Sequence, residues 1–248
     1  MRGLKNKVAI VTGALGDIGY ASAARLVEEG CRIAIFDNKD DEKGLAAKID
    51  CPFHRVDISD ETQVREAAAR VLSQLGPASI LVNCAAVFVL KSVDATPQDW
   101  QRSLSVNVMG TSLVTKHVVP HMETLGGGSI INFSSVSGFI GQGNVATYNA
   151  TKFAVRGLAK CWALDLAPKN IRVNSICPGY VMTSSYEKGC KELGIDFEQS
   201  KRDALAIQLL QKIPAPDQIA AGVAFLASDD AAVMTGSDLV MDAGYLAK

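Results

Sequence analysis

The stretch KVAIVTGALGDIG, residues 7–19, decides how the rest of the chain is interpreted. A short apolar run rich in β-branched residues ends at Thr12, and the glycine-rich turn TGALGDIG follows it directly. An apolar run bounded by glycine is typical of a buried strand, and a helical pattern begins after the turn. Glycines there let the backbone approach a pyrophosphate, and the helix points its free N–H groups at that phosphate. The stretch therefore predicts a dinucleotide site at the start of the fold.

Six further apolar runs repeat this pattern of a strand followed by a helical segment. They are residues 32–37, 52–57, 79–85, 129–135, 171–179 and 238–244. Continuous apolar strands are typical of a sheet covered on both faces. Helical segments are expected near 18–29, 40–49, 60–75, 97–123, 148–168 and 217–227. The alternation predicts an α/β fold, a doubly wound parallel sheet (Rossmann fold) of about seven strands with right-handed crossovers.

The chain shows no linker, repeat or low-complexity tract within its 248 residues. We therefore expect a single dinucleotide-binding and catalytic domain over residues 1–248. One polar, partly helical insertion lies at about 184–213, and this lobe is predicted to cover the substrate.

Charge and cysteine usage restrict the class of protein. The sequence has 25 Lys plus Arg against 26 Asp plus Glu, which gives no electrostatic basis for binding nucleic acid or an anionic membrane. No apolar run approaches the roughly 18 residues that a transmembrane helix needs. The six cysteines are scattered without a CxxC spacing, so we expect reduced, buried thiols and a cytoplasmic protein.

The second strand ends at Asp37, at the position where dinucleotide folds bind the adenosine ribose. A carboxylate there accepts hydrogen bonds from both ribose hydroxyls and repels a 2′-phosphate. Asn38, not an arginine, follows it. The sequence therefore predicts NAD rather than NADP, the alternative being an exposed aspartate that merely ends a strand.

Seven segments match a known family pattern in its order along the chain. They are TGALGDIG (12–19), Asp57-Ile58, NCAA (83–86), Asn107 within SVNVMG, Ser135 followed by YNATK (148–152), PGYVMT (178–183) and TGSDLVMDAGY (235–245). In these segments, and over nearly all its length, the chain resembles the short-chain dehydrogenase/reductase family. Four positions depart from the pattern: Asp17 replaces the middle glycine, Cys84 and Ala86 replace residues of an NNAG segment, and Ala243 replaces a glycine. Asp17 is expected to cap its own helix, with its side chain facing away from the phosphates.

The resemblance implies a set of site residues. The catalytic group is Asn107, Ser135, Tyr148 and Lys152. The cofactor would contact Thr12, Gly13, Gly16, Asp17, Ile18, Gly19, Asp37, Asp57, Ile58, Asn83, Ala85, Pro178, Gly179, Val181 and Thr183, together with Tyr148 and Lys152. The family also implies that Asn107 holds a water that links Lys152 to solvent.

Tyr148 and Lys152 are spaced i, i+4, so their side chains share one helix face. Free tyrosine has a pKa of about 10, and a nearby ammonium favours the phenolate. Tyr148 would exchange a proton with an alcohol or ketone whose oxygen Ser135 orients. The alternative is a solvated pair on a helix surface. The prediction is an NAD-dependent oxidoreductase that acts on a secondary alcohol or its ketone.

Two other functions remain open. One is an NADPH-dependent carbonyl or 3-oxoacyl-thioester reductase, and the other is a catalytically silent dinucleotide-binding regulatory protein. The substrate is expected to be a small polar alcohol, polyol or sugar. The pocket would be lined by residues 87–89, residues 136–144 with Gln142 and Asn144, Tyr180, Tyr186 and the 184–213 lobe.

Two helical segments, 97–123 and 148–168, are apolar almost all round, which predicts a subunit interface in a homodimer or homotetramer. Ordinary burial beneath the 184–213 lobe is the alternative. His117 and His121 with Glu123 superficially resemble metal ligands, but Pro120 interrupts the turn and no third ligand has suitable spacing. No metal is therefore predicted.

Overall fold

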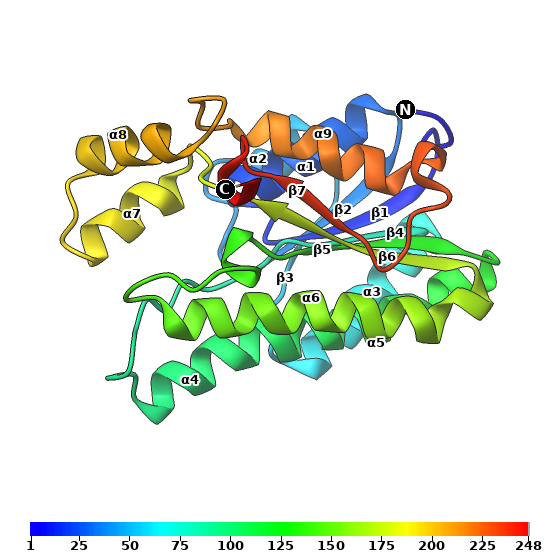
Figure 1. The fold of residues 1–248 in the computed structure, drawn as a ribbon. Coiled ribbons are helices and arrows are strands. Elements are labelled where there is room, and N and C mark those ends of the chain that lie inside the picture. Colours follow the sequence, from blue (N-terminus) through cyan, green and yellow to red (C-terminus); the bar gives the residue numbers. More distant parts are fainter. Residues whose placement is uncertain (248) are drawn as a thin grey trace.

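The protein is described by a computed structural model that gives a defined place to residues 1–247. Within them lies one seven-stranded sheet in the order β3-β2-β1-β4-β5-β6-β7, and each neighbouring pair is parallel (Figure 1). The strands are β1 (Val8–Thr12), β2 (Arg32–Asp37), β3 (Phe53–Arg55), β4 (Ile80–Asn83), β5 (Gly128–Phe133), β6 (Ile171–Pro178) and β7 (Asp238–Met241). This confirms the predicted doubly wound parallel sheet.

Helices cover both faces of the sheet (Figure 1). They are α1 (Asp17–Glu28), α2 (Leu45–Lys48), α3 (Glu61–Leu75), α4 (Pro97–Leu104), α5 (Thr111–Thr124), α6 (Ala146–Leu166), α7 (Ser184–Glu192), α8 (Phe197–Ile207) and α9 (Pro216–Ala227). Helices α1 and α9 lie on one face, and α3, α5 and α6 lie on the other. None of the helices among residues 1–247 has both the length and the hydropathy needed to cross a membrane.

Strand β1 shows why the sequence runs are continuously apolar. Ala9 and Val11 belong to the core beneath α1 and α9, whereas Val8 and Ile10 belong to the core beneath α3, α5 and α6. Alternate side chains of a strand point to opposite faces, so both sets must be apolar when both faces are covered.

Two expected helices differ from the structure. Residues 40–49 form only the single turn α2, because Gly44 has a left-handed backbone with φ of +60° and Asp41 accepts hydrogen bonds from the free N–H groups of Leu45 and Ala46. The segment 97–123 is divided by a π-helical turn over Ser105–Gly110. A Cβ atom on Gly110 would lie 2.7 Å from the side chain of Ile58, so this turn packs closely against the loop after β3.

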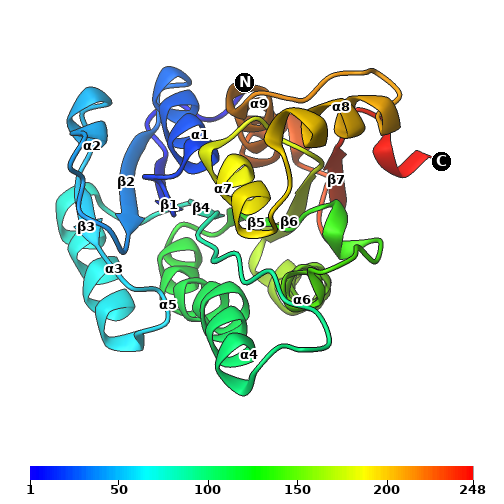
Figure 2. The same cartoon turned by 90° about the vertical axis from the view of Figure 1, so that its left-hand side faces the viewer.

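Parallel strands bring their carboxyl ends to one edge of the sheet. The chain passes from β1 to β2 and β3 on one side of β1 and then crosses to β4 on the other side. This change of direction opens the crevice where doubly wound sheets bind ligands. Helices α7 and α8, the two helices of the 184–213 lobe, stand in front of this edge (Figure 2).

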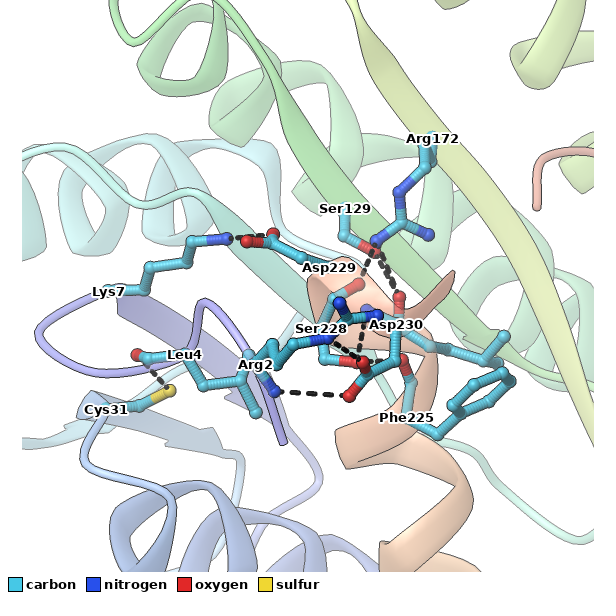
Figure 3. A network of polar contacts seen from close by, with 11 residues as sticks. Arg2, Leu4, Lys7, Cys31, Ser129, Arg172, Phe225, Ser228, Asp229 and Asp230 are labelled. Carbon is cyan, nitrogen blue, oxygen red and sulfur yellow. Dashed lines mark hydrogen bonds and ion pairs between the residues drawn. The ribbon is translucent and has the colours of Figure 1, made fainter. Parts of the chain in front are cut away.

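A polar network fastens the opposite edge of the sheet (Figure 3). Arg172, near the start of β6, donates to the carbonyl oxygen of Leu226 at 2.8 Å, and Ser129 of β5 donates to the same oxygen at 2.9 Å. A cation at the end of a helix such as α9 satisfies free carbonyls and complements the helix dipole. Arg2 pairs with Asp230 just beyond α9, so the N-terminal segment and α9 are held together.

Candidate active site

The glycine-rich turn is shaped by close backbone contacts. Gly13 has φ of +66°, and a Cβ atom there would lie 2.6 Å from the Cα atom of Ala85. A Cβ atom on Gly19 would lie 2.2 Å from the carbonyl oxygen of Gly13. Gly16 is exposed, and a Cβ atom on it would meet only that same oxygen, at 3.3 Å. The first and third glycines therefore allow the turn to close, whereas the second leaves its backbone open to a ligand.

Asp37 is held beside this turn. Its carboxylate accepts hydrogen bonds from the N–H of Leu15 at 3.0 Å and from the N–H of Lys39 at 3.2 Å, and the residue is 8% exposed. The predicted ribose-binding carboxylate thus has a fixed position between the turn and the loop after β2.

A cavity of about 460 Å³ opens beside Asp37 and is lined by Asn38, Arg55, Asp57 and Gln63. Asp57 accepts hydrogen bonds from the N–H and hydroxyl of Ser59, and Ile58 is buried. The open glycine backbone, Asp37 and this polar cavity together fit an adenine dinucleotide.

Thr12 and Asn83 have protein partners for their side chains. The Thr12 hydroxyl accepts from the N–H groups of Cys84 and Ala85, each at 3.1 Å. The Asn83 amide donates to Thr115 at 3.1 Å and to Asn132 at 2.9 Å. Both side chains hold the ends of β1 and β4 in place.

The prediction that Asp17 caps its own helix is wrong. Helix α1 has Gly16 as its N-cap residue, with no side-chain capping hydrogen bond. Instead, one Asp17 carboxylate oxygen accepts from the N–H of Ser184 at 2.7 Å and from its hydroxyl at 2.8 Å. Asp17 lies inside the first turn of α1, so its side chain extends outward and reaches the free N–H at the start of α7. The carboxylate therefore connects the glycine-rich turn to the 184–213 lobe.

Replacing Asp17 with glycine should loosen the start of α7. Loss of a capping carboxylate costs about 1 kcal/mol, so amide hydrogen exchange in the first turn of α7 should quicken about fivefold. Exchange measured by mass spectrometry on peptides spanning 184–192 tests this. Asp17→Asn keeps an acceptor oxygen and should show a smaller change, whereas Asp196→Gly, which removes the N-cap of α8, should leave α7 unaffected. Equal exchange in Asp17→Gly and the wild type would contradict the connection.

Tyr148 and Lys152 lie on one face of α6, as predicted. The Lys152 ammonium is 5.4 Å from the centroid of the Tyr148 ring and donates to the carbonyl oxygen of Phe133 at 2.8 Å. Lys152 is 4% exposed, and its own carbonyl accepts from the Ser134 hydroxyl at 2.9 Å. These contacts hold the start of α6 against the carboxyl end of β5.

Burial acts on both members of this pair. It raises the pKa of Tyr148, and a hydrogen bond with Ser135 opposes that rise. Burial lowers the pKa of Lys152 to about 8. The prediction that Lys152 gives Tyr148 a lowered pKa is therefore wrong for the protein alone, because removal of water disfavours the charged form of each group.

Ser135 begins a chain of hydroxyl contacts. It precedes a 3-10 turn over Val136–Gly138, and its oxygen accepts from the N–H of Ser137 at 3.1 Å. The Ser135 hydroxyl lies 3.2 Å from the Ser137 hydroxyl, which donates to the side-chain oxygen of Gln142 at 2.5 Å. A Cβ atom on Gly138 would lie 2.8 Å from the Lys152 carbonyl oxygen, so glycine allows this turn to press against α6.

Asn107 lies in the π-helical turn and is 1% exposed. Its side chain bonds both main-chain groups of Val87, donating to the carbonyl at 3.0 Å and accepting from the N–H at 2.8 Å. It also donates to Thr151 on α6 at 3.1 Å. Asn107 thus fixes the loop after β4 against α6, and π-helical turns of this kind are frequent at functional sites.

The loop that Asn107 fixes brings an aromatic ring to Tyr148. Phe88 stacks on the tyrosine ring with 5.1 Å between centroids and 20° between planes. Phe88 is 46% exposed, so it offers an apolar surface beside the predicted proton-transfer group.

The segment after β6 leads into the lobe. Pro178 ends the strand, Gly179 approaches Asp242 so closely that a Cβ atom would lie 3.0 Å from its Cα atom, and Val181 is buried. Thr183 is the N-cap residue of α7 and accepts from the N–H of Tyr186 at 3.0 Å. This path brings all of the 178–183 motif to the carboxyl edge of the sheet.

Aromatic rings join the lobe to this edge. Tyr180 packs against Tyr186 of α7, with 5.5 Å between centroids, and against Tyr245 near the C-terminus, with 6.0 Å. Sequence reasoning missed two contacts of the site, those of Ser137 and Ser184. The SVS spacing of 135–137 was a usable signal for the first, because serine commonly bonds the backbone two residues away. No local signal indicated the second.

The two histidines that superficially resemble a metal pair have different partners. His117 lies 3.1 Å from Glu61, whereas His121 is buried and accepts from the N–H of Ala78 at 3.4 Å. No disulfide joins the cysteines, which are all in the described part of the chain; Cys161 is exposed, contrary to the expectation of buried thiols.

Comparison with known proteins agrees with this geometry. A family model described as Enoyl-(Acyl carrier protein) reductase matches residues 13–246. The chain is 37% identical to D-threitol dehydrogenase of Mycolicibacterium smegmatis, with 99% of this chain and 95% of the relative covered. It is 38% identical to NADP-dependent (R)-specific alcohol dehydrogenase of Lentilactobacillus kefiri, with 99% and 98% covered.

A solved structure, the ligand-free aldohexose dehydrogenase of Thermoplasma acidophilum, superposes with a TM-score of 0.92 at 32% identity. The match covers 99% of this chain and 96% of that one. The chain belongs to the short-chain dehydrogenase/reductase family, and it is an oxidoreductase of that family's nicotinamide-dependent kind.

Proposed function

We propose that the protein is an NAD-dependent oxidoreductase that transfers a hydride between the nicotinamide ring and a secondary alcohol or its ketone. One observation carries the proposal: Tyr148, Lys152 and Ser135 converge where β5 meets α6, at the same sheet edge as the open glycine-rich turn. A free-standing surface pair would have none of these surroundings, since Lys152 is 4% exposed and bonded to the main chain.

Each side chain has a separate task in this reaction. Ser135 forms a hydrogen bond with the substrate oxygen and orients it, and Tyr148 takes the hydroxyl proton as the carbonyl forms. The dinucleotide, when bound, would accept the hydride, that is, the hydrogen of the carbinol carbon together with both electrons of its C–H bond. Lys152 stabilises the phenolate form of Tyr148, and in the reverse direction Tyr148 returns the proton to the ketone oxygen.

The proton of Tyr148 needs an exit. Asn107 holds the loop and α6 in the arrangement described, and a water at its main chain would connect Lys152 to solvent. This assignment rests on the family and on the position of Asn107 in the π-helical turn.

Asp37 supports NAD as the cofactor. The carboxylate has a fixed position, and a 2′-phosphate beside it would meet charge repulsion. The relative from Lentilactobacillus kefiri is NADP-dependent by name, so relatives of this chain differ in cofactor preference. The competing function is an NADPH-dependent carbonyl or 3-oxoacyl-thioester reductase, and a relative that is 34% identical to this chain is a 3-oxoacyl-[acyl-carrier-protein] reductase by name.

Assays that follow the absorbance of the reduced nicotinamide distinguish the NAD-dependent function from the NADPH-dependent one. Wild-type protein should show kcat/KM for NAD about a hundredfold above that for NADP, which corresponds to about 2.8 kcal/mol of repulsion between the carboxylate and the phosphate. Asp37→Asn should lower the ratio of kcat/KM for NAD to kcat/KM for NADP by about tenfold or more. A wild-type preference for NADP would show that Asp37 does not select the cofactor.

We further propose a small polar alcohol, polyol or sugar as substrate. The related D-threitol dehydrogenase and aldohexose dehydrogenase are named for substrates of this class. A panel of polyols, sugars, hydroxy acids, hydroxyacyl thioesters and hydroxysteroids tests the class in the same assay. NAD binding without turnover of any panel member would favour a catalytically silent regulatory protein instead.

The exposed apolar side chains of α4 to α6 support a homo-oligomer, a dimer or tetramer. Leu104, Met109, Phe153 and Leu164 are 42%, 47%, 46% and 79% exposed. Exposed apolar residues on neighbouring helices are typical of a subunit interface. Sedimentation velocity should give a mass at least twice that of the 26.3 kDa chain, and a monomer at micromolar concentration would contradict the proposal.

A further inference from the structure

Helix α6 carries a third polar side chain in line with Tyr148 and Lys152. Arg156 follows Lys152 by four residues, so the three residues are spaced i, i+4, i+8 and share one helix face. Tyr148 and Lys152 take part in the proposed reaction, whereas no step described above uses Arg156. Its side chain is nevertheless only 19% exposed, although arginine is mostly a surface residue. The fold therefore holds this cation in a defined place.

The guanidinium group of Arg156 holds the 3-10 turn that follows Ser135. Its Nη1 donates to the carbonyl oxygen of Gly138, the last residue of that turn. Its central carbon lies 3.4 Å from the centroid of the Phe139 ring, so the planar group stacks on the next side chain. Arg156 thus contacts two consecutive residues at the end of the turn, one by a hydrogen bond and the other by stacking.

Strand β7 fixes the same guanidinium group from another direction. Nη2 of Arg156 donates to a carboxylate oxygen of Asp238 at 2.9 Å, and the Asp238 side chain is 12% exposed. A hydrogen bond between two charged groups is stronger than one between neutral groups, and the planar fork of arginine fixes the direction of each N–H. Because Asp238 belongs to the sheet, Arg156 connects the turn to both α6 and β7.

Ser135 depends on this turn for its orientation. The N–H of Gly138 donates to the Ser135 carbonyl at 2.9 Å, and the N–H of Ser137 donates to the Ser135 side-chain oxygen at 3.1 Å. A Cβ atom on Gly138 would lie 2.8 Å from Cδ of Arg156, so the turn packs directly on the arginine stem. A movement of the Gly138 peptide would therefore disturb the turn that orients the Ser135 hydroxyl.

We propose that Arg156 is a positioning residue for the reaction, which orients the Ser135 hydroxyl toward the substrate oxygen by holding Gly138 and Phe139. The inference rests on the proposed oxidoreductase function and adds a residue that acts on it only through Ser135.

Removing the guanidinium group should slow turnover without weakening the binding of NAD. With the panel alcohol that the wild type oxidises fastest, Arg156→Met should lower kcat about tenfold, since a misplacement of about 1 Å can cost about a hundredfold and a smaller one costs less. The dissociation constant for NAD, measured by fluorescence titration, should stay within about twofold, because Gly138, Phe139 and Asp238 are not among the expected cofactor contacts. A wild-type kcat in Arg156→Met overturns the inference.

A double-mutant cycle with Ser135 distinguishes positioning from a general structural role. In Ser135→Ala no hydroxyl remains to be oriented, so adding Arg156→Met should lower kcat by less than about twofold. A purely structural role would lower kcat by the same factor with and without the Ser135 hydroxyl, and that result overturns the inference.

Lys160 provides the matched control. It lies one turn further along α6 and pairs with the same Asp238 oxygen at 3.0 Å, but its other printed partner is the carbonyl of Gly236 rather than the turn after Ser135. Lys160→Met should therefore keep kcat within about twofold of the wild type. Equal losses of kcat in Lys160→Met and Arg156→Met would place the effect at Asp238 and β7, which overturns the inference.

Amide hydrogen exchange reports on the turn without any turnover. In Arg156→Met, peptides spanning 135–140 should exchange about fivefold faster or more, while peptides of β5 should be unchanged. If Arg156→Met does not fold, Arg156→Lys takes its place, because it keeps a cation for Asp238 but lacks the planar fork that bonds Gly138 and stacks on Phe139. Wild-type kcat and exchange in that variant would equally overturn the inference.

Failure of the underlying function gives a different result. If no form of the protein oxidises any panel alcohol with NAD or NADP, the proposed oxidoreductase activity fails. The exchange measurement then decides separately whether Arg156 holds the turn of Ser135, and unchanged exchange over 135–140 in Arg156→Met overturns that contact as well.

Discussion

Replacing Tyr148 with phenylalanine should lower kcat by about a thousandfold or more at saturating NAD and alcohol. The substitution removes the hydroxyl that takes the substrate proton, and a positioned acid–base group contributes roughly 10²- to 10⁴-fold. It keeps the ring, so the stacking with Phe88 at 5.1 Å should persist and NAD should still bind. Steady-state kinetics and a fluorescence titration with NAD measure the two effects.

Tyr20 provides the matched control for this substitution. It lies on α1 and is not among the predicted catalytic or cofactor-contacting residues, so Tyr20→Phe deletes a hydroxyl without touching the reacting atoms. Its kcat should stay within about twofold of wild type, as for most substitutions away from a site. A Tyr148→Phe enzyme that keeps a tenth or more of the wild-type kcat would rule out Tyr148 as the proton acceptor.

Replacing Lys152 with methionine should affect activity and stability in different ways. Turnover should fall by about a hundredfold or more, because the phenolate loses its neighbouring ammonium. The effect on the free energy of unfolding should depend on pH, since burial lowers the pKa of Lys152 from 10.5 to about 8.

The sign of this pH dependence follows from whether the folded or the unfolded chain binds the lysine proton more tightly. Between pH 8 and 10.5 the unfolded chain holds the lysine proton and the folded protein releases it, so stability rises with pH in this window. Below pH 8 the folded protein bears the full cost of the buried ammonium. Wild type should therefore gain about 2 kcal/mol relative to Lys152→Met between pH 7 and pH 9.5.

Urea unfolding at a series of pH values measures this gain. Lys160→Met provides the control, because Lys160 is on the same helix but its side chain is 51% exposed in an ion pair with Asp238. Exposed ion pairs contribute about 1 kcal/mol or less, so the stability of this variant should change with pH in the same way as that of the wild type. A difference between wild type and Lys152→Met that does not change with pH would mean that the buried amine has an ordinary pKa.

The fold was predictable because its main signal is local. Each of the seven strands lies in an apolar run visible in the sequence, since a sheet covered on both faces needs apolar side chains at every position. The predictions were wrong where the conformation depends on a few specific contacts rather than on the composition of the segment. Asp41 and Gly44 shorten the helix expected at 40–49 to one turn. The π-helical turn at Ser105–Gly110 was also invisible, because it depends on the close packing of Gly110 against Ile58.

The candidate site was predictable only in part, and for a similar reason. The spacing of Tyr148 and Lys152 fixes their shared helix face, and the structure places them so. The contact of Asp17 with Ser184 joins residues 167 positions apart, and no periodicity in a sequence reports such a pairing. Likewise, the raised pKa of Tyr148 follows from burial, which depends on the assembled fold rather than on its neighbours in sequence.

The polar network of Arg172, Ser129 and α9 has a consequence for how this protein can change. It fastens the chain at the amino ends of the strands, whereas the substrate would be recognised at their carboxyl ends. Substitutions at distant sites have nearly additive effects on stability, so variation in 136–144 and 184–213 should leave that fastening intact. The chain is therefore suited to acquire new substrate preferences by mutation: most variants randomised in these two segments should keep cooperative thermal unfolding, while variants that lack Arg172 should tolerate far fewer such changes.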